Sequence, residues 1–266
     1  MNGPPDDEPR RRWPPLLWAA IALPLWAAIA MLPAALVGAA TQSRMPPLWL
    51  LIPGLLFATP LILRVDRRVG PETPPALVAP PLAWWTAAAL LAGTGATILV
   101  SEVGNILLSV RAYSPIVPEG PTVDPWTAAL LGLLQPVCLV AVLHGVVQRA
   151  LAVRLPASWV VAGTIALGAA FGGGGLAVQF GLLLILPTWL FRHTWALLPS
   201  AAAILPQSII PLLAAAGLAP GIPGFDVTSP DEVLWQPIWF NVLGAVLLAA
   251  GVGPLMGAFG VGRDDA

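Results

Sequence analysis

The stretch WTAALLGLLQPVCLVAVLHGVVQR, residues 126–149, decides the fold class. Before Arg149, its only strongly polar side chains are those of Gln135, His144 and Gln148. A helix of this length is about 36 Å long, at 1.5 Å per residue, and the hydrocarbon core of a bilayer is about 30 Å thick. The stretch therefore predicts a transmembrane helix that ends at a basic residue.

The composition of the whole chain indicates a membrane protein. Hydrophobic residues make up 58% of the chain, charged residues only 9%, and the mean hydropathy is +0.84. This leaves too little polar surface to cover a water-soluble globule, so we expect an all-α polytopic membrane protein. All 12 basic residues are arginine, and the formal net charge of -1 gives no electrostatic case for binding nucleic acid. A lysine-free chain rich in alanine and proline is typical of GC-rich bacteria, so we expect the bacterial inner membrane.

Span counting predicts about eight transmembrane helices in one bundle. The predicted spans cover residues 16–40, 46–63, 82–101, 126–148, 157–174, 175–191, 195–218 and 235–259. The predicted organisation is a disordered cytoplasmic tail (1–14), two transmembrane helices with a loop (15–79), a membrane domain (80–260) and a C-terminal tail (261–266). Prolines within several spans favour kinks, so we expect helices that bend around an interior cavity.

Arginine placement predicts the orientation, since cytoplasmic loops carry the excess of positive charge. An even number of spans puts both termini on one side, and that side holds ten of the twelve arginines. Only Arg44 and Arg111 fall on the other side. The two long loops there, 102–125 and 219–234, carry mostly acidic charges. We therefore predict that both termini are cytoplasmic.

The polar end of the stretch 126–149 is the strongest candidate for a site within the membrane. His144 and Gln148 are four residues apart and share a helix face, with Arg149 one position round from it. In a structural interpretation, Arg149 extends to the cytoplasmic interface and His144 hydrogen-bonds to a neighbouring helix. In the other interpretation these side chains bind a ligand.

The inventory of ligating residues does not predict a zinc site. A catalytic zinc needs about three protein ligands and a general base beside its water. The chain has two histidines, His144 and His193, and Cys138 is its only cysteine. Cys138 lies in an apolar run, which predicts a small buried hydrophobe. A serine protease is also disfavoured, because no serine within the spans has a histidine at helical spacing.

Three segments of the second half follow one another in an order that resembles a known family. They are HGVVQRA (144–150), ALGAAFGGGG (166–175) and RHTWALLPSAAAILPQ (192–207), and VSEVGNILLSV (100–110) precedes them. From about residue 80 onward the chain resembles the CPBP intramembrane proteins, the CAAX-protease and bacteriocin-processing family of glutamate metalloproteases. Members of that family typically carry EExxFRG on a membrane helix, then FxxxH, then HxxxN.

The resemblance covers residues 80–260 and implies the family's fold, with which the eight predicted helices of the whole chain agree, but it does not imply the family's chemistry. His144 and Gly145 stand where the paired glutamates would be, and Arg149 matches the family's arginine. Ala203 occupies a histidine position, and Gln207 lies at or next to the asparagine. In the family the glutamates activate water and the histidines hold the metal. Because these residues are replaced here, the resemblance argues against the activity.

We therefore expect an inactive homologue that keeps the cavity and binds a lipid, a lipidated peptide or another membrane protein. No cofactor is expected, and zinc only if the family activity is retained. The candidate cavity residues are His144, Gly145, Gln148, Arg149, Ala203 and Gln207. Two alternatives stay open: an active CAAX-type endopeptidase with relocated groups such as Glu102, and a small permease or exporter accessory subunit. The lack of a charged pair within the predicted spans weighs against ion coupling.

Overall fold

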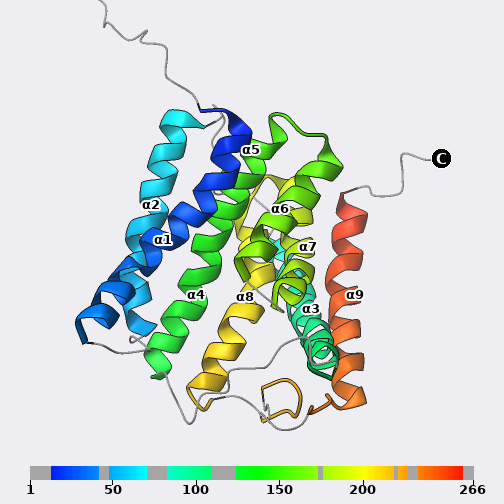
Figure 1. The fold of residues 1–266 in the computed structure, drawn as a ribbon. Coiled ribbons are helices and arrows are strands. Elements are labelled where there is room, and N and C mark those ends of the chain that lie inside the picture. The colour runs from blue at the N-terminus through cyan, green and yellow to red at the C-terminus, as the bar shows by residue number, and fades with distance from the viewer. Residues whose placement is uncertain are drawn as a thin grey trace, which may run out of the picture.

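The described part of the chain is a bundle of helices (Figure 1). The computed structural model describes residues 13–41, 48–70, 83–109, 124–172, 176–218, 221–226 and 233–259. The predicted tails therefore lie outside the described residues, except for residues 13 and 14. The helices are α1 (Pro15–Thr41), α2 (Leu51–Val69, after the 3-10 turn Leu48–Leu50), α3 (Ala83–Ser109), α4 (Pro125–Val142), the π-helical segment η2 (Leu143–Gln148), α5 (Arg149–Ala152), α6 (Ala157–Gly172), α7 (Leu176–Thr194), α8 (Leu197–Ala215) and α9 (Ile238–Ala258).

The helix lengths confirm the prediction of an all-α polytopic membrane protein. Within the described ranges, six helices are long and apolar enough to cross a bilayer. They are Pro15–Thr41, Leu48–Val69, Trp84–Ser109, Pro125–Ala152, Leu197–Ala214 and Ile238–Ala258. The helices α6 and α7 occupy the two remaining predicted spans, 157–174 and 175–191.

The helix that contains the stretch 126–149 lies at the centre of the bundle. α4, η2 and α5 run on without a break, with α1 and α2 on one side and α6, α7 and α8 on the other (Figure 1). Every residue from 138 to 151 is buried. Residues from both halves of the chain join this core, among them Trp18, Leu23, Ile62, Leu184, Phe191 and Ile204. The two N-terminal helices thus share one core with the remaining helices.

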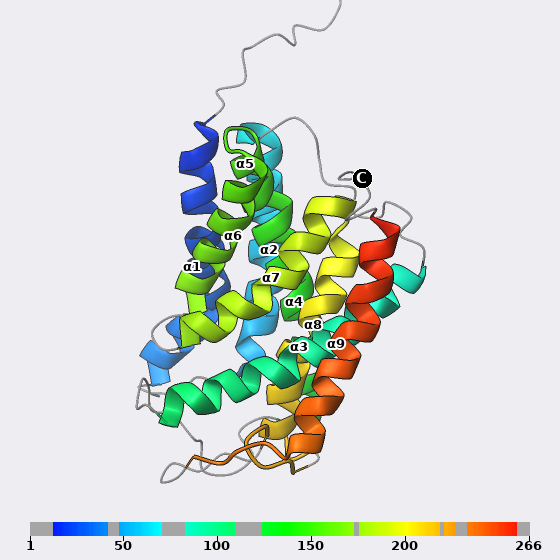
Figure 2. The same cartoon turned by 90° about the vertical axis from the view of Figure 1, so that its right-hand side faces the viewer.

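A second, smaller core forms where α3 crosses the bundle. α3 runs obliquely over α8 and α9 (Figure 2). The crossing is close because of glycine: a Cβ on Gly93 would collide with the backbone of Ala203, and one on Gly251 would collide with the backbone of Ala88. Small residues at such crossings let backbones approach, which is how helices gain van der Waals contact within a bilayer.

The start of α4 carries two features of a helix N-terminus that can be recognised in the sequence. The carboxylate of Asp124 accepts a hydrogen bond from the backbone N–H of Thr127 (2.9 Å), and Pro125 occupies the first helical position. Both features are typical of a helix N-terminus, since the cap satisfies a backbone donor and proline has none to satisfy.

Two of the described helices extend much further than predicted. α2 continues to Val69 instead of residue 63, and α3 continues to Ser109 instead of residue 101. In both cases the prediction ended the helix at the first charged residues. These residues are helix-compatible, and Asp66 and Asn105 are buried inside the bundle where other helices or loops supply hydrogen bonds. The polar residues after positions 63 and 101 therefore make contacts within the bundle and do not mark the ends of the two helices.

Candidate functional site

The π-helical segment η2 places His144 and Gln148 in the interior. Both side chains are fully buried, at 0% and 1% exposure, and Gly145 between them is buried as well. A π-helical turn adds a residue to the helix turn and is found mostly as a short insertion, frequently at functional sites. Here it spans six residues within a continuous helix.

His144 and Gln148 form a hydrogen-bonded pair that reaches α7. His144 Nδ1 lies 2.8 Å from Gln148 Oε1, and Gln148 Nε2 donates to the carbonyl oxygen of Thr188 at 3.2 Å. Because the amide nitrogen faces a carbonyl, the amide oxygen must face the imidazole, so Nδ1 carries the proton and Nε2 is the acceptor. His144 also stacks on Phe191 of α7, with ring centroids 5.6 Å apart.

This pair leaves two buried polar atoms without hydrogen bonds. Within the described part of the chain, neither His144 Nε2 nor Thr188 Oγ1 has a hydrogen-bond partner. The prediction that His144 would bond to a neighbouring helix was wrong in its detail. The histidine bonds to Gln148 on its own helix, and it is Gln148 that bridges to α7.

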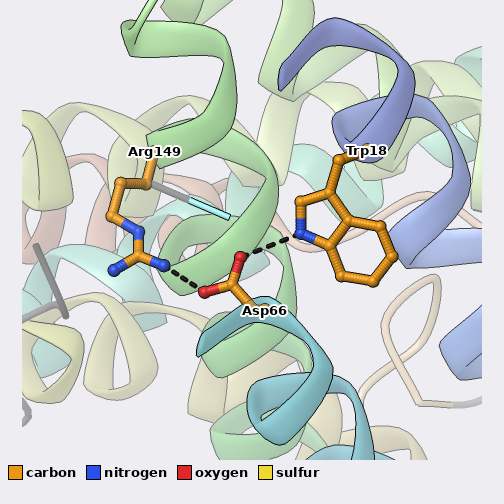
Figure 3. A network of polar contacts seen from close by, with 3 residues as sticks. All are labelled: Trp18, Asp66 and Arg149. Atoms are coloured by element: carbon orange, nitrogen blue, oxygen red, sulfur yellow. Dashed lines mark hydrogen bonds and ion pairs between the residues drawn. The ribbon is translucent and has the colours of Figure 1, made fainter. Parts of the chain in front are cut away.

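Arg149 is buried in an ion pair with Asp66 (Figure 3). Its Nη2 donates to Asp66 Oδ2, while Trp18 Nε1 donates to the other carboxylate oxygen, Oδ1, at 2.8 Å. The arginine and aspartate side chains are only 6% and 4% exposed. The three residues come from α5, α2 and α1, so one carboxylate joins three helices. Trp26 Nε1 donates to Thr59 Oγ1 at 2.9 Å and ties α1 to α2 a second time.

This ion pair corrects two expectations. Arg149 does not extend to the interface, because the Asp66 carboxylate holds it inside the bundle. The expected lack of a charged pair within the spans was also wrong, since α2 extends beyond residue 63 and carries Asp66 into the core. A signal for Asp66 was present in the sequence: it lies four and seven residues after Ile62 and Thr59, on the buried face of α2.

The predicted site residues on α8 lie in another core. Ala203 is buried against Ala88, Ala89 and Leu255, in the cluster where α3 crosses the bundle. Gln207 is half-buried, and its Oε1 has no hydrogen-bond partner among the described residues. The structure thus brings His144, Gly145, Gln148 and Arg149 together on one helix and leaves Ala203 in a separate cluster.

The ligating residues in the described ranges are dispersed. No three His, Cys, Asp or Glu side chains there lie close enough together to hold a metal ion. Cys138 is buried, as expected of a small hydrophobe. Glu102, the group that the peptidase alternative would relocate, accepts hydrogen bonds from Asn105 Nδ2 and from the backbone N–H of Gln236, two residues before α9 begins. The start of α9 lies at the end of the bundle opposite to α5 (Figure 2).

Near that opposite end lies an apolar cavity whose described lining includes none of the predicted cavity residues. Its volume is about 270 Å³, and it lies between α3, α8, α9 and the loop that follows α8. Among the described lining residues, only Thr94 has a side-chain hydroxyl, and this hydroxyl donates to the Leu90 carbonyl at 2.9 Å. The lining residues are Thr94, Ile98, Ile210, Leu213, Leu218, Ile222, Phe225, Phe240, Leu243 and Leu247.

A polar network borders this cavity. Asn105 Nδ2 donates to Glu102 Oε2 at 2.7 Å and to the Gly224 carbonyl at 2.8 Å. Gln236 Nε2 lies 3.3 Å from both the Ile98 and the Gly224 carbonyls and also donates to Ser101 Oγ. We refer to Ser101, Glu102, Asn105, Gly224 and Gln236 as the rim network. The rim network adjoins the cavity at two residues. Ile98, whose carbonyl contacts Gln236, lines the cavity, and so does Phe225, which follows Gly224 in the chain.

Comparisons of the chain with protein families, with curated proteins and with solved structures found no match.

Proposed function

We propose that this membrane protein binds the acyl chain of a membrane lipid in the cavity between α3, α8 and α9. The observation that carries the proposal is the cavity itself, which has about 270 Å³ of space and no free hydrogen-bonding group on its described lining. Water gains nothing in such a space, because it needs two to four polar partners. An apolar chain fits it.

The surroundings of the cavity favour a lipid as the source of that chain. Leu243 lines the cavity and is 40% exposed, and its neighbours Trp239, Val242 and Val246 on α9 are more exposed still. In a bilayer this exposed face meets hydrocarbon. Through Leu243 the cavity therefore borders the region where lipid tails are the most abundant apolar chains. Of the three expected ligand classes, a lipid agrees best with this position.

The family relationship and the loss of catalysis remain part of the proposal. They are supported by the spacing of the motifs and by the replacement of the glutamates at His144 and Gly145. The position of Glu102 gives the peptidase alternative no support, because its described hydrogen bonds come from Asn105 and Gln236, at the other end of the bundle from His144. The arginine pattern supports cytoplasmic termini, which would place the cavity near the outer leaflet.

Filling the cavity tests the proposal. Leu213→Trp puts an indole into the lining, and Leu133→Trp is the matched control on the exposed surface of α4. The full chain is purified in mild detergent, and the bound lipid per protein is counted by native mass spectrometry. If the indole removes about 1.4 kcal/mol of chain packing, Leu213→Trp retains about tenfold less lipid than the wild type. Equal retention by the wild type and both variants, or no retained lipid in any of them, would contradict acyl-chain binding in this cavity.

A further inference from the structure

We infer that the lipid carries a primary ammonium group, which the rim network binds through Glu102 and Gln236. This inference rests on the proposed function, because it names the polar end of the ligand whose chain fills the cavity. Lipid tails are as apolar as leucine side chains, so moving one from the bilayer into the cavity gives little hydrophobic gain. Selective binding requires a polar contact.

The amide orientations in the rim network are fixed by their neighbours. Asn105 Nδ2 faces a carboxylate oxygen and the Gly224 carbonyl, so both of its protons are used. Gln236 Nε2 faces the Ile98 and Gly224 carbonyls. A flipped amide would set oxygen against oxygen in either case. The neighbouring carbonyls therefore fix the orientation of the Gln236 amide, and its side-chain oxygen can only accept hydrogen bonds.

The network holds more acceptors than donors. Gln236 is 5% exposed, and its Oε1 is buried with no hydrogen-bond partner among the described residues. The Glu102 carboxylate accepts from Asn105 Nδ2 and from the backbone N–H of Gln236, and both bonds reach Oε2. Ser101 supplies no donor, since its Oγ donates to the Ile98 carbonyl at 2.7 Å. Among the described residues, Gln236 Oε1 has no donor and the Glu102 carboxylate has only neutral donors, so a cationic donor would satisfy both groups.

The backbone holds the network against the cavity. Gly224 has a φ of +70°, a conformation that favours glycine, and a Cβ there would lie 2.8 Å from the Gln236 nitrogen. The next residue, Phe225, packs edge-on against Phe240 with ring centroids 4.9 Å apart, and both rings line the cavity. Because Ile98 and Phe225 belong to the lining and also adjoin the rim network, one amphiphile can contact both the cavity and the network.

The chemistry distinguishes an ammonium from other headgroups. A primary ammonium has three N–H donors, which suit Gln236 Oε1 and the carboxylate of Glu102 together. A quaternary ammonium has no N–H and cannot satisfy the buried amide oxygen. A phosphoglycerol headgroup brings only anionic charge and hydroxyl groups to a network that already carries a carboxylate. The expected ligand is thus an aminolipid such as phosphatidylethanolamine.

Headgroup competition tests the inference. The full chain is titrated with dioleoyl phosphatidylethanolamine, phosphatidylcholine and phosphatidylglycerol, with binding counted by native mass spectrometry. We expect the wild type to prefer the ethanolamine lipid by about tenfold or more, as a charge-assisted hydrogen bond allows. Glu102→Gln should abolish that preference and still retain lipid. The control Asp124→Asn removes the carboxylate that caps α4, keeps a good helix cap and should preserve the preference.

The outcomes separate the two proposals. Lipid that is retained with no headgroup preference would overturn the ammonium site and leave acyl-chain binding intact. A preference that survives Glu102→Gln would also overturn the site. Arg111 lies outside the described residues, so Arg111→Gln is tested as well. If this variant gains an ethanolamine preference that the wild type lacks, Arg111 is the cation of Glu102 and the inference fails. Failure to retain any lipid would overturn both proposals.

Discussion

Replacing Asp66 by alanine is expected to lower the free energy of unfolding by about 3–5 kcal/mol. The change removes the carboxylate that Arg149 Nη2 and Trp18 Nε1 both contact. The side chains of Asp66 and Arg149 are both buried, so water cannot replace the lost carboxylate. The lost tryptophan hydrogen bond adds about 0.6 kcal/mol, the average for side-chain bonds between membrane helices.

The expected loss of stability arises because one charge of a buried ion pair is left unpaired, and not because an aspartate side chain is missing. A buried ion pair gains little over a well-packed apolar pair, because both charges are desolvated. The double variant Asp66→Leu with Arg149→Met is therefore expected to lie between neutral and about 4 kcal/mol more stable than the wild type. The two single changes should each be destabilising, so their sum and the double variant differ by several kcal/mol.

Unfolding in mixed micelles measures this prediction. The fraction of sodium dodecyl sulfate is raised while tryptophan fluorescence is followed, with 12 tryptophans as reporters. Arg154→Ala is the control, because Arg154 is exposed in the turn after α5 and surface changes stay within about 0.5 kcal/mol. The reasoning is refuted if Asp66→Ala costs less than about 1 kcal/mol, the range of solvent-exposed pairs. It is also refuted if the two single costs simply add in the double variant.

Two further predictions use the same assay. Gly93→Ala should lower the free energy of unfolding by about 1–3 kcal/mol, because the new Cβ meets the Ala203 backbone. The control Gly253→Ala, in open space on α9, should be neutral or stabilising. Equal effects of the two changes would contradict the close crossing of α3 and α8. His144→Leu should cost about 1–3 kcal/mol because it leaves the buried Gln148 Oε1 without its donor, and an unchanged stability would contradict the hydrogen-bonded pair.

The apolar spans were predictable because each one is a continuous run of mostly apolar residues in the sequence. The stretch 126–149 is the clearest case, and the helix Pro125–Ala152 contains all of it. Helix ends were less predictable where charge interrupted the run. Asp66 looked like part of an arginine-rich loop, and its burial depends on Arg149, 83 residues later in the chain. A local sequence pattern cannot predict a partner that lies so many residues further along the chain.

The candidate site was predictable only in part, for the same reason. His144 and Gln148 share a helix, so their spacing was enough to predict their proximity. The rim network depends on contacts between Asn105 and Gly224, 119 residues apart, and between Gln236 and Ile98, 138 residues apart. The π-helical form of Leu143–Gln148 could not be predicted either, because the segment reads as ordinary apolar helix in sequence.

The position of Asp66 also bears on the order of biosynthesis. The chain is made from its N-terminus, so α1 with Trp18 precedes α2, and Arg149 follows Asp66 by 83 residues. At about 5–20 residues per second, a ribosome needs about 4–17 s to reach Arg149 after it has added Asp66. During that interval the nascent hairpin of α1 and α2 carries a carboxylate whose counter-charge does not yet exist. Insertion of Pro125–Ala152 therefore completes the N-terminal hairpin as well as its own span, and a chain truncated before Arg149 cannot neutralise Asp66 in this way.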